Sequence, residues 1–135
     1  MYLLDTDTIV YLLKGHPGVR SNLALHADDV VGTSAITLLE LYYGAFRSQQ
    51  VAGNLARIRT LEKGVKIWDL GREMAEVFGV LKAELEREGI RLDDFDLAIA
   101  ACALCHDLTL VTNNAAHFGR VRGLRLENWA AVTPA

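Results

Sequence analysis

Long hydrophobic runs, cysteine and proline are all scarce in this chain of 135 residues. Although 51% of the residues are hydrophobic, no uninterrupted apolar stretch approaches the roughly 18 residues that a membrane span requires. No charged segment precedes the first apolar residues, and Asp5 and Asp7 interrupt that apolar run, which argues against a signal peptide. We therefore expect a cytoplasmic protein that does not enter a membrane.

Cysteine is limited to Cys102 and Cys105, which together with His106 match the C-x-x-C-H pattern of covalent haem attachment. Haem attachment follows export, for which the sequence shows no signal, and Met1 and Met74 are poor candidates for a second axial ligand. A zinc site would need more ligands than His106 supplies. We interpret both cysteines as small buried hydrophobic residues with reduced thiols, and a haem or redox centre is the alternative.

Short extended runs alternate with helical runs, without a linker, repeat or low-complexity segment. The predicted strands cover residues 2–4, 30–36, 65–70, 108–112 and 124–127. The predicted helices cover residues 37–48, 73–88 and 96–106, with Gly89 as a stop signal after the second. Pro17 and Gly18 indicate a turn. This alternation predicts one α/β domain over residues 1–135, with three layers (α/β/α) around a central, mostly parallel sheet.

Three acidic residues stand beside these apolar runs. Asp5 follows residues 2–4, Glu40 follows the apolar stretch of residues 30–39, and Asp96 opens an apolar helical run. In an α/β protein, strand ends and helix starts gather along one edge of the sheet. Carboxylates that converge there repel one another unless a cation neutralises them. The pattern therefore predicts a divalent-metal site.

Helix capping is the simpler interpretation of an acid at a helix start. We favour it for Asp93 and Asp94, and we expect Asp7 to cap a helix that begins near Ile9. For Asp96 alone, cap and ligand are equally good interpretations, and the other two acids favour the ligand. The hydroxyls of three threonines can donate hydrogen bonds to these carboxylates, or they can serve as capping or turn hydroxyls: Thr6, Thr37 and Thr112.

Four segments then carry a family resemblance: Leu4–Thr8, Ser34–Ala45, Asp94–Ala101, and Leu110–Asn114 followed by Phe118. In this order and spacing they resemble the PIN-domain ribonucleases, and within these the VapC toxins of bacterial and archaeal toxin–antitoxin pairs. The resemblance continues through Gly123–Trp129 and so spans nearly the whole chain.

The resemblance implies an endoribonuclease that depends on Mg²⁺ or Mn²⁺ and hydrolyses RNA phosphodiester bonds. It also implies a homodimer and inhibition by a VapB-like antitoxin protein. Asp5, Glu40 and Asp96 match the metal-binding acids of the family, and Asn114 matches a fourth catalytic position, commonly Asp or Asn. Many relatives carry an acid where this chain has His117, which bears on whether a second metal ion binds. We interpret His117 itself as a surface or loop histidine.

The sequence predicts the surfaces that contact RNA or protein less clearly. The formal net charge of −3 does not indicate nucleic-acid binding. A carboxylate-rich site contributes part of this negative charge, however, so the net charge says little about a local basic surface. Two locally basic stretches are candidates for RNA phosphate contacts: Arg47, Arg57, Arg59, Lys63 and Lys66, and Arg120, Arg122 and Arg125. The apolar residues around Leu38, Leu41, Tyr42 and Phe46 suggest a protein interface.

Two other functions remain open. Asp5 and Asp7 resemble the nucleophile motif of haloacid-dehalogenase-like phosphatases, in which the first aspartate attacks phosphorus. That family also requires an acid pair after an apolar strand, whereas Asp93 and Asp94 follow a polar segment. The other alternative is a catalytically weak PIN-like module that binds RNA or protein, which the absence of acids at positions 114 and 117 favours.

Overall fold

Five strands form one parallel sheet in the computed structural model, which describes residues 1–131. Residues 132–135, included in the domain predicted above, lie outside the described residues. The strands are β1 (Tyr2–Leu4), β2 (Val31–Ser34), β3 (Lys66–Trp68), β4 (Thr109–Val111) and β5 (Arg125–Glu127). Their order is β3-β2-β1-β4-β5, and every pairing is parallel. The predicted sheet is confirmed, although all strands except β1 are shorter than expected.

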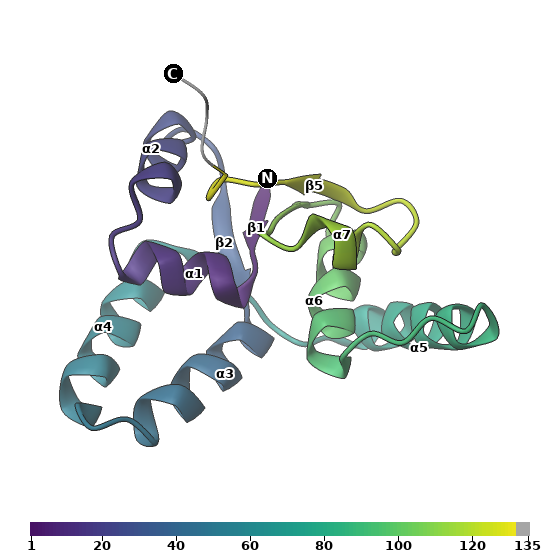
Figure 1. Cartoon of the computed structure of the whole chain (residues 1–135), viewed down its shortest axis with the longest axis horizontal. Helices are drawn as coiled ribbons and strands as arrows, with labels where there is room; N and C mark the ends of the chain where they lie inside the picture. The colour runs from purple at the N-terminus through teal and green to yellow at the C-terminus, as the bar shows by residue number, and fades with distance from the viewer. Residues whose placement is uncertain (132–135) are drawn as a thin grey trace.

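Helices cover both faces of this sheet, as Figure 1 shows. They are α1 (Thr6–Leu13), α2 (Pro17–Leu25), α3 (Ala35–Phe46), α4 (Val51–Gly64), α5 (Arg72–Arg87), α6 (Asp94–Cys105) and α7 (Ala115–Phe118). The first four lie on one side of the sheet in the view of Figure 1, and α5 and α6 lie on the other. The predicted three-layer α/β/α class is therefore confirmed. Within residues 1–131, no helix has the length and apolar character that crossing a membrane requires.

Two hydrophobic cores result from the alternation of side chains along the strands. Leu3 and Leu110 belong to the core under α5 and α6, whereas Leu4 and Val111 belong to the core under α1 and α4. All four side chains are completely buried. A parallel sheet that helices cover on both faces requires such continuous apolar strands.

Helix α6, whose sequence is an apolar run rich in alanine, has the most buried residues of the described helices. Cys102 is fully buried in its core, and burial raises the pKa of its thiol to about 11. The thiol is therefore protonated at neutral pH and unreactive. Cys105 is half-buried and burial also raises its pKa. The interpretation of Cys102 as a small hydrophobic residue is confirmed.

The sequence-based assignment missed α2, α4 and α7. Pro17 is the first residue of α2 instead of part of a turn, and the Nδ1 atom of His16 caps that helix by accepting from the backbone N–H groups of Gly18 and Val19. Helix α4 starts without a side-chain cap and contains Gly53, which weakens its helical signal. A further correction concerns α1: it begins at Thr6, so Asp5 caps it and Asp7 does not. Asp93 caps α6 as predicted, whereas the same prediction for Asp94 is wrong: Asp94 is the first residue of α6 and pairs with Lys82.

The predicted protein interface on α3 is also partly wrong. Leu41 is buried, and Leu38 and Tyr42 are half-buried against the same core. Phe46 is exposed as predicted, and the other large apolar side chains exposed on α3 are Leu39 and Tyr43; the exposed fractions are 63%, 54% and 67%. Their spacing of four and three residues places them on one face of the helix.

A glycine in β2 provides a test of the sheet packing. A Cβ at Gly32 would overlap the carbonyl oxygen of Lys66 in β3 and lie 2.7 Å from the Trp68 ring. We predict that Gly32→Ala lowers the free energy of unfolding by about 1–3 kcal/mol, because neither neighbour can move without separating the strands. Gly53→Ala in α4, where a Cβ meets nothing within 4 Å, should instead raise it by about 0.5–1 kcal/mol. Equal effects in urea unfolding would contradict this packing.

Candidate active site

The four predicted site residues line one small cavity at the carboxyl-terminal edge of the sheet. Asp5 directly follows β1, Glu40 lies in the second turn of α3, Asp96 lies in the first turn of α6, and Asn114 precedes α7. The cavity has a volume of about 70 Å³, and Thr6, Asp7 and Phe118 complete its lining. The structure thus brings together residues that are 18 to 109 positions apart in the chain, as the parallel topology predicts.

Asp5 is the most buried of the acids, with 4% of its surface exposed. Its Oδ1 atom accepts a hydrogen bond of 2.9 Å from the backbone N–H of Thr8, which fixes the start of α1. Burial raises the pKa of the Asp5 carboxyl, and hydrogen bonds from Thr112 and Thr8 offset part of this rise. Asp5 is therefore both a helix cap and a rigidly placed carboxylate.

Glu40 is held by a threonine from the neighbouring helix. The Oγ1 atom of Thr6 donates to Glu40 Oε1 at 2.7 Å and lies 3.1 Å from Thr37 Oγ1. Burial raises the pKa of the Glu40 carboxyl, the Thr6 hydrogen bond lowers it, and the charge of Asp96 raises it further. The prediction that threonine hydroxyls bind these carboxylates is confirmed for Thr6.

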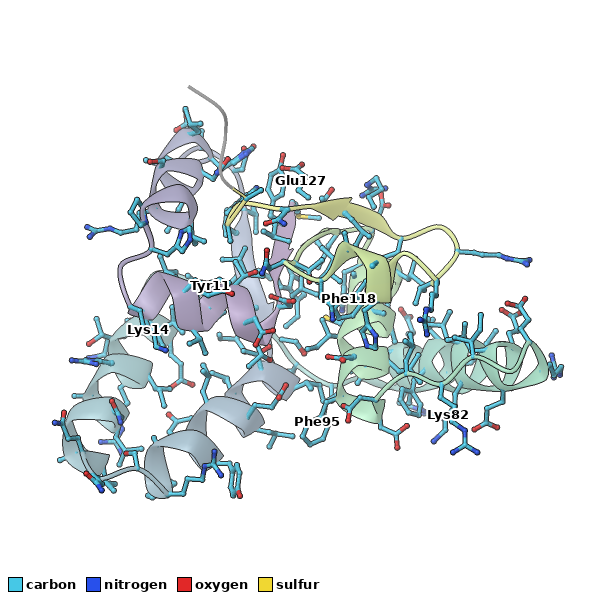
Figure 2. All side chains as sticks on the ribbon, viewed as in Figure 1. Tyr11, Lys14, Lys82, Phe95, Phe118 and Glu127 are labelled. Atoms are coloured by element: carbon cyan, nitrogen blue, oxygen red, sulfur yellow. The ribbon has the colours of Figure 1, made fainter. Side chains whose placement is uncertain are left out.

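Asp96 pairs with His117, which the sequence did not predict. The Nε2 atom of His117 lies 3.0 Å from Asp96 Oδ2, and both side chains are only partly exposed. Burial raises the pKa of Asp96, whereas the hydrogen bond and charge of His117 lower it. His117 belongs to α7, which the buried Phe118 anchors. His117 thus lies in a short helix instead of a loop, with 25% of its side chain exposed, and it contacts Asp96. Figure 2 labels Phe118, the next residue of α7.

Asn114 contributes a neutral amide to the cavity. It is the N-cap residue of α7, but its side chain makes no capping hydrogen bond. Its backbone N–H donates to Thr112 Oγ1 at 3.0 Å, which ties the start of α7 to the end of β4. The amide oxygen is thus available at the cavity as a ligand or a hydrogen-bond acceptor.

No lysine or arginine within residues 1–131 forms an ion pair with Asp5, Glu40 or Asp96. Their pKa values are raised by burial and, in part, by neighbouring acids, and among the described residues His117, beside Asp96, is the one basic partner of the cluster. Carboxylate and amide oxygens are the ligands that hard divalent cations prefer. The donor set therefore fits such an ion.

The side chains of this cluster nevertheless need to move before they can hold an ion. In the described part of the chain, no three acidic, histidine or cysteine side chains are grouped tightly enough to hold an ion as they stand. Threonine holds Glu40 and histidine holds Asp96, each by a hydrogen bond. Closing around an ion thus requires these two side chains to rotate, whereas Asp5 is fixed by its capping role.

Comparison with known proteins identifies the family. Residues 2–124 match the PIN domain. The chain is 39% identical to ribonuclease VapC2 of Haemophilus influenzae, over 95% of this chain and 97% of the relative, and 37% identical to the tRNA(fMet)-specific endonuclease VapC of Shigella flexneri, over 96% and 98%. Its fold matches a chain in the crystal structure of VapBC2 from Rickettsia felis bound to a promoter DNA fragment, with a TM-score of 0.90, 35% identity, and coverage of 95% and 98%.

The chain therefore belongs to the PIN-domain family and, within it, to the VapC ribonucleases. The phosphatase interpretation of Asp5 and Asp7 is set aside on this finding. Membership in the family also implies the use of a divalent metal ion.

The raised pKa of Glu40 gives a prediction for stability against pH. The folded state binds the carboxyl proton of Glu40 more tightly than the unfolded chain does. Above the folded pKa, ionisation of Glu40 therefore lowers the free energy of unfolding. This cost disappears as the pH falls below 4.5, the ordinary pKa of a glutamate. With EDTA present, we predict that Glu40→Gln is more stable than the wild type at pH 7, by less than about 1 kcal/mol because the group is half-exposed.

Urea unfolding between pH 4 and pH 8 measures this difference. Glu84→Gln, which changes an exposed glutamate of α5, is the control and should give no such gain. A Glu40→Gln advantage that stays constant down to pH 4 would show that the ionised carboxylate is not its cause.

Proposed function

We propose that this protein is a Mg²⁺- or Mn²⁺-dependent endoribonuclease that acts as the toxin of a toxin–antitoxin pair, and that its four site residues are catalytic. The observation that supports this proposal best is the convergence of Asp5, Glu40, Asp96 and Asn114 on one cavity without a neutralising lysine or arginine. The family membership supports the choice of RNA as the substrate.

In this proposal, Asp5, Glu40 and Asp96 hold the divalent ion. A bound ion of this kind supplies positive charge to the phosphoryl oxygens and makes a coordinated water more acidic. Asp5 is positioned for the task by Thr8 and Asp96 by His117. Hydrogen bonds of this type commonly fix the orientation of carboxylates that bind a metal ion.

Side chains of the cavity then accept the proton of the attacking water and contact the substrate. Glu40 has a raised pKa and a partly exposed carboxylate at the cavity, so it can orient the attacking water and accept its proton. The Thr6 hydroxyl, which donates to Glu40 Oε1, leaves the second carboxylate oxygen for this role. Asn114 offers its amide to the substrate or to water. The expected products carry a 5′-phosphate and a 3′-hydroxyl.

We also propose a homodimer and an antitoxin partner. The exposed face of α3 formed by Leu39, Tyr43 and Phe46 has the apolar character of a protein interface, and Phe95 at the start of α6 is 45% exposed. Similar structures from Rickettsia felis and Salmonella typhimurium are VapBC complexes, which supports a VapB-like antitoxin for this chain. An RNA substrate and such a partner place the proposed activity in the cytoplasm.

Cleavage of RNA tests the function directly. We predict that the wild type cuts RNA in the presence of Mg²⁺ or Mn²⁺ and that EDTA abolishes cutting, because the acids alone cannot activate water. The variants Asp5→Asn and Asp96→Asn should each lower the rate at least about a hundredfold. Asn at position 5 retains the helix cap, so this loss should occur without unfolding.

The Shigella relative is named as specific for tRNA(fMet), so initiator tRNA is the first substrate to test, followed by total RNA with mapping of the new ends. Asp28→Asn, which changes an exposed aspartate outside the cavity, serves as the control and should retain wild-type activity. Metal-dependent RNA binding without any cutting would contradict the proposal and favour the catalytically weak binding module.

A further inference from the structure

A second and larger cavity lies beside the acidic site. It has a volume of about 550 Å³ and lies between α1, α3 and α4, the three helices on the lower left of Figure 1. Thr6 and Glu40 line both cavities, so the two are adjacent. The apolar part of the lining consists of Val10, Leu13, Leu41, Ala45 and Ile58. This lining is a surface on which a flat, partly apolar group can rest.

Three cationic side chains line the same cavity, one from each helix. Lys14 follows α1, Arg47 follows α3, and Arg57 lies in α4. Figure 2 shows the labelled Lys14 at the end of α1 that faces α4. Convergence of three positive charges from separate helices costs electrostatic energy unless an anion is present.

These cations also lack internal partners. Within residues 1–131, the side chains of Lys14, Arg47 and Arg57 make no hydrogen bond or ion pair, although Arg47 lies over the Tyr43 ring. By contrast, Arg122 pairs with Glu88 at 3.1 Å and Arg125 pairs with Asp107 at 2.8 Å. The cations around the larger cavity are therefore free to bind an external anion, whereas those two arginines of the other basic stretch are engaged.

We propose that this cavity binds one nucleotide of the RNA strand next to the phosphate that is cut. Lys14, Arg47 and Arg57 bind its phosphate, and its base rests on the apolar lining between α1 and α4. The proposal rests on the ribonuclease function and adds the part of the substrate that the acidic cavity, at about 70 Å³, is too small to hold. Such a contact supplies the affinity and positioning that an acidic site, which repels RNA, cannot supply.

An inhibitory protein segment is the competing occupant. The three cations of the larger cavity attract a phosphate, which every nucleotide of an RNA strand carries. Charge complementarity therefore favours the RNA strand.

Gly44 allows the cavity to be blocked without disturbing the protein. It lies in α3, lines the cavity, and a Cβ built on it meets nothing within 4 Å. A leucine there should enter the space of the proposed nucleotide, and replacing a helical glycine should preserve or raise stability. Gly53→Leu in α4 is the matched control, because it has the same open surroundings and does not line the cavity.

The experiment measures binding of a short fluorescent single-stranded RNA over a range of salt concentrations, with Asp96→Asn in every protein to prevent cutting. One variant combines Lys14→Gln, Arg47→Gln and Arg57→Gln. Its charge-matched control combines Arg72→Gln, Arg87→Gln and Arg91→Gln, which lie on or shortly after α5 and are exposed. We expect the first to bind roughly tenfold to a hundredfold more weakly than the control, with a salt slope reduced by about 0.7 for the loss of one phosphate contact.

Gly44→Leu should weaken binding by a similar factor while Gly53→Leu leaves it unchanged. Equal affinities and slopes in the two charge variants would overturn the proposal, as would normal binding by Gly44→Leu. Loss of antitoxin binding with normal RNA binding would also overturn it and assign the cavity to the partner. Cutting of RNA by the unaltered protein, measured in parallel, separates these outcomes from failure of the ribonuclease function.

Discussion

Mutual repulsion among buried carboxylates is the constraint on which the functional site depends. Asp5, Glu40 and Asp96 come from separate elements, and the parallel sheet with its two covering layers forces them toward one edge. Burial raises the pKa of each, and no lysine or arginine in the described part of the chain pairs with them. A protein that keeps such an arrangement does so at a cost in stability, which a bound divalent cation removes. The site is therefore better suited to holding an ion than to stabilising the fold.

The hydrogen bonds within the acidic cluster explain how this cost is limited. Thr8 and the start of α1 hold Asp5, Thr6 holds Glu40, and His117 holds Asp96. Each partner stabilises the charged form of its carboxylate and keeps it away from the others. With Asp5 held in place, ion binding requires rotation of the Glu40 and Asp96 side chains. The fixed carboxylate, Asp5, is the one whose backbone follows the central strand β1.

The sequence was sufficient to predict the strands and the convergence of the three acids, because Asp5 follows the apolar run of a buried parallel strand and Glu40 and Asp96 lie near the starts of helices at the same edge of the sheet. Helices α2, α4 and α7 were missed for local reasons: α2 begins with Pro17 and is capped by a histidine, α4 lacks a side-chain cap, and α7 is very short. The contact between His117 and Asp96 could not be predicted, because it joins residues 21 positions apart through the placement of α7 on β4. The cavity of Lys14, Arg47 and Arg57 likewise depends on how α4 packs beside α1 and α3.

Binding of Mn²⁺ in the absence of RNA tests the central claim most directly, since it measures the ion and not the reaction. Titration calorimetry on the wild type should show saturable binding, and Asp5→Asn, Glu40→Gln and Asp96→Asn should each weaken it, roughly tenfold or more. The bound ion should also raise the midpoint of thermal unfolding of the wild type and have little effect on the variants. Equal Mn²⁺ affinity in the wild type and all three variants would contradict the account, because the ion would then bind somewhere other than between these carboxylates.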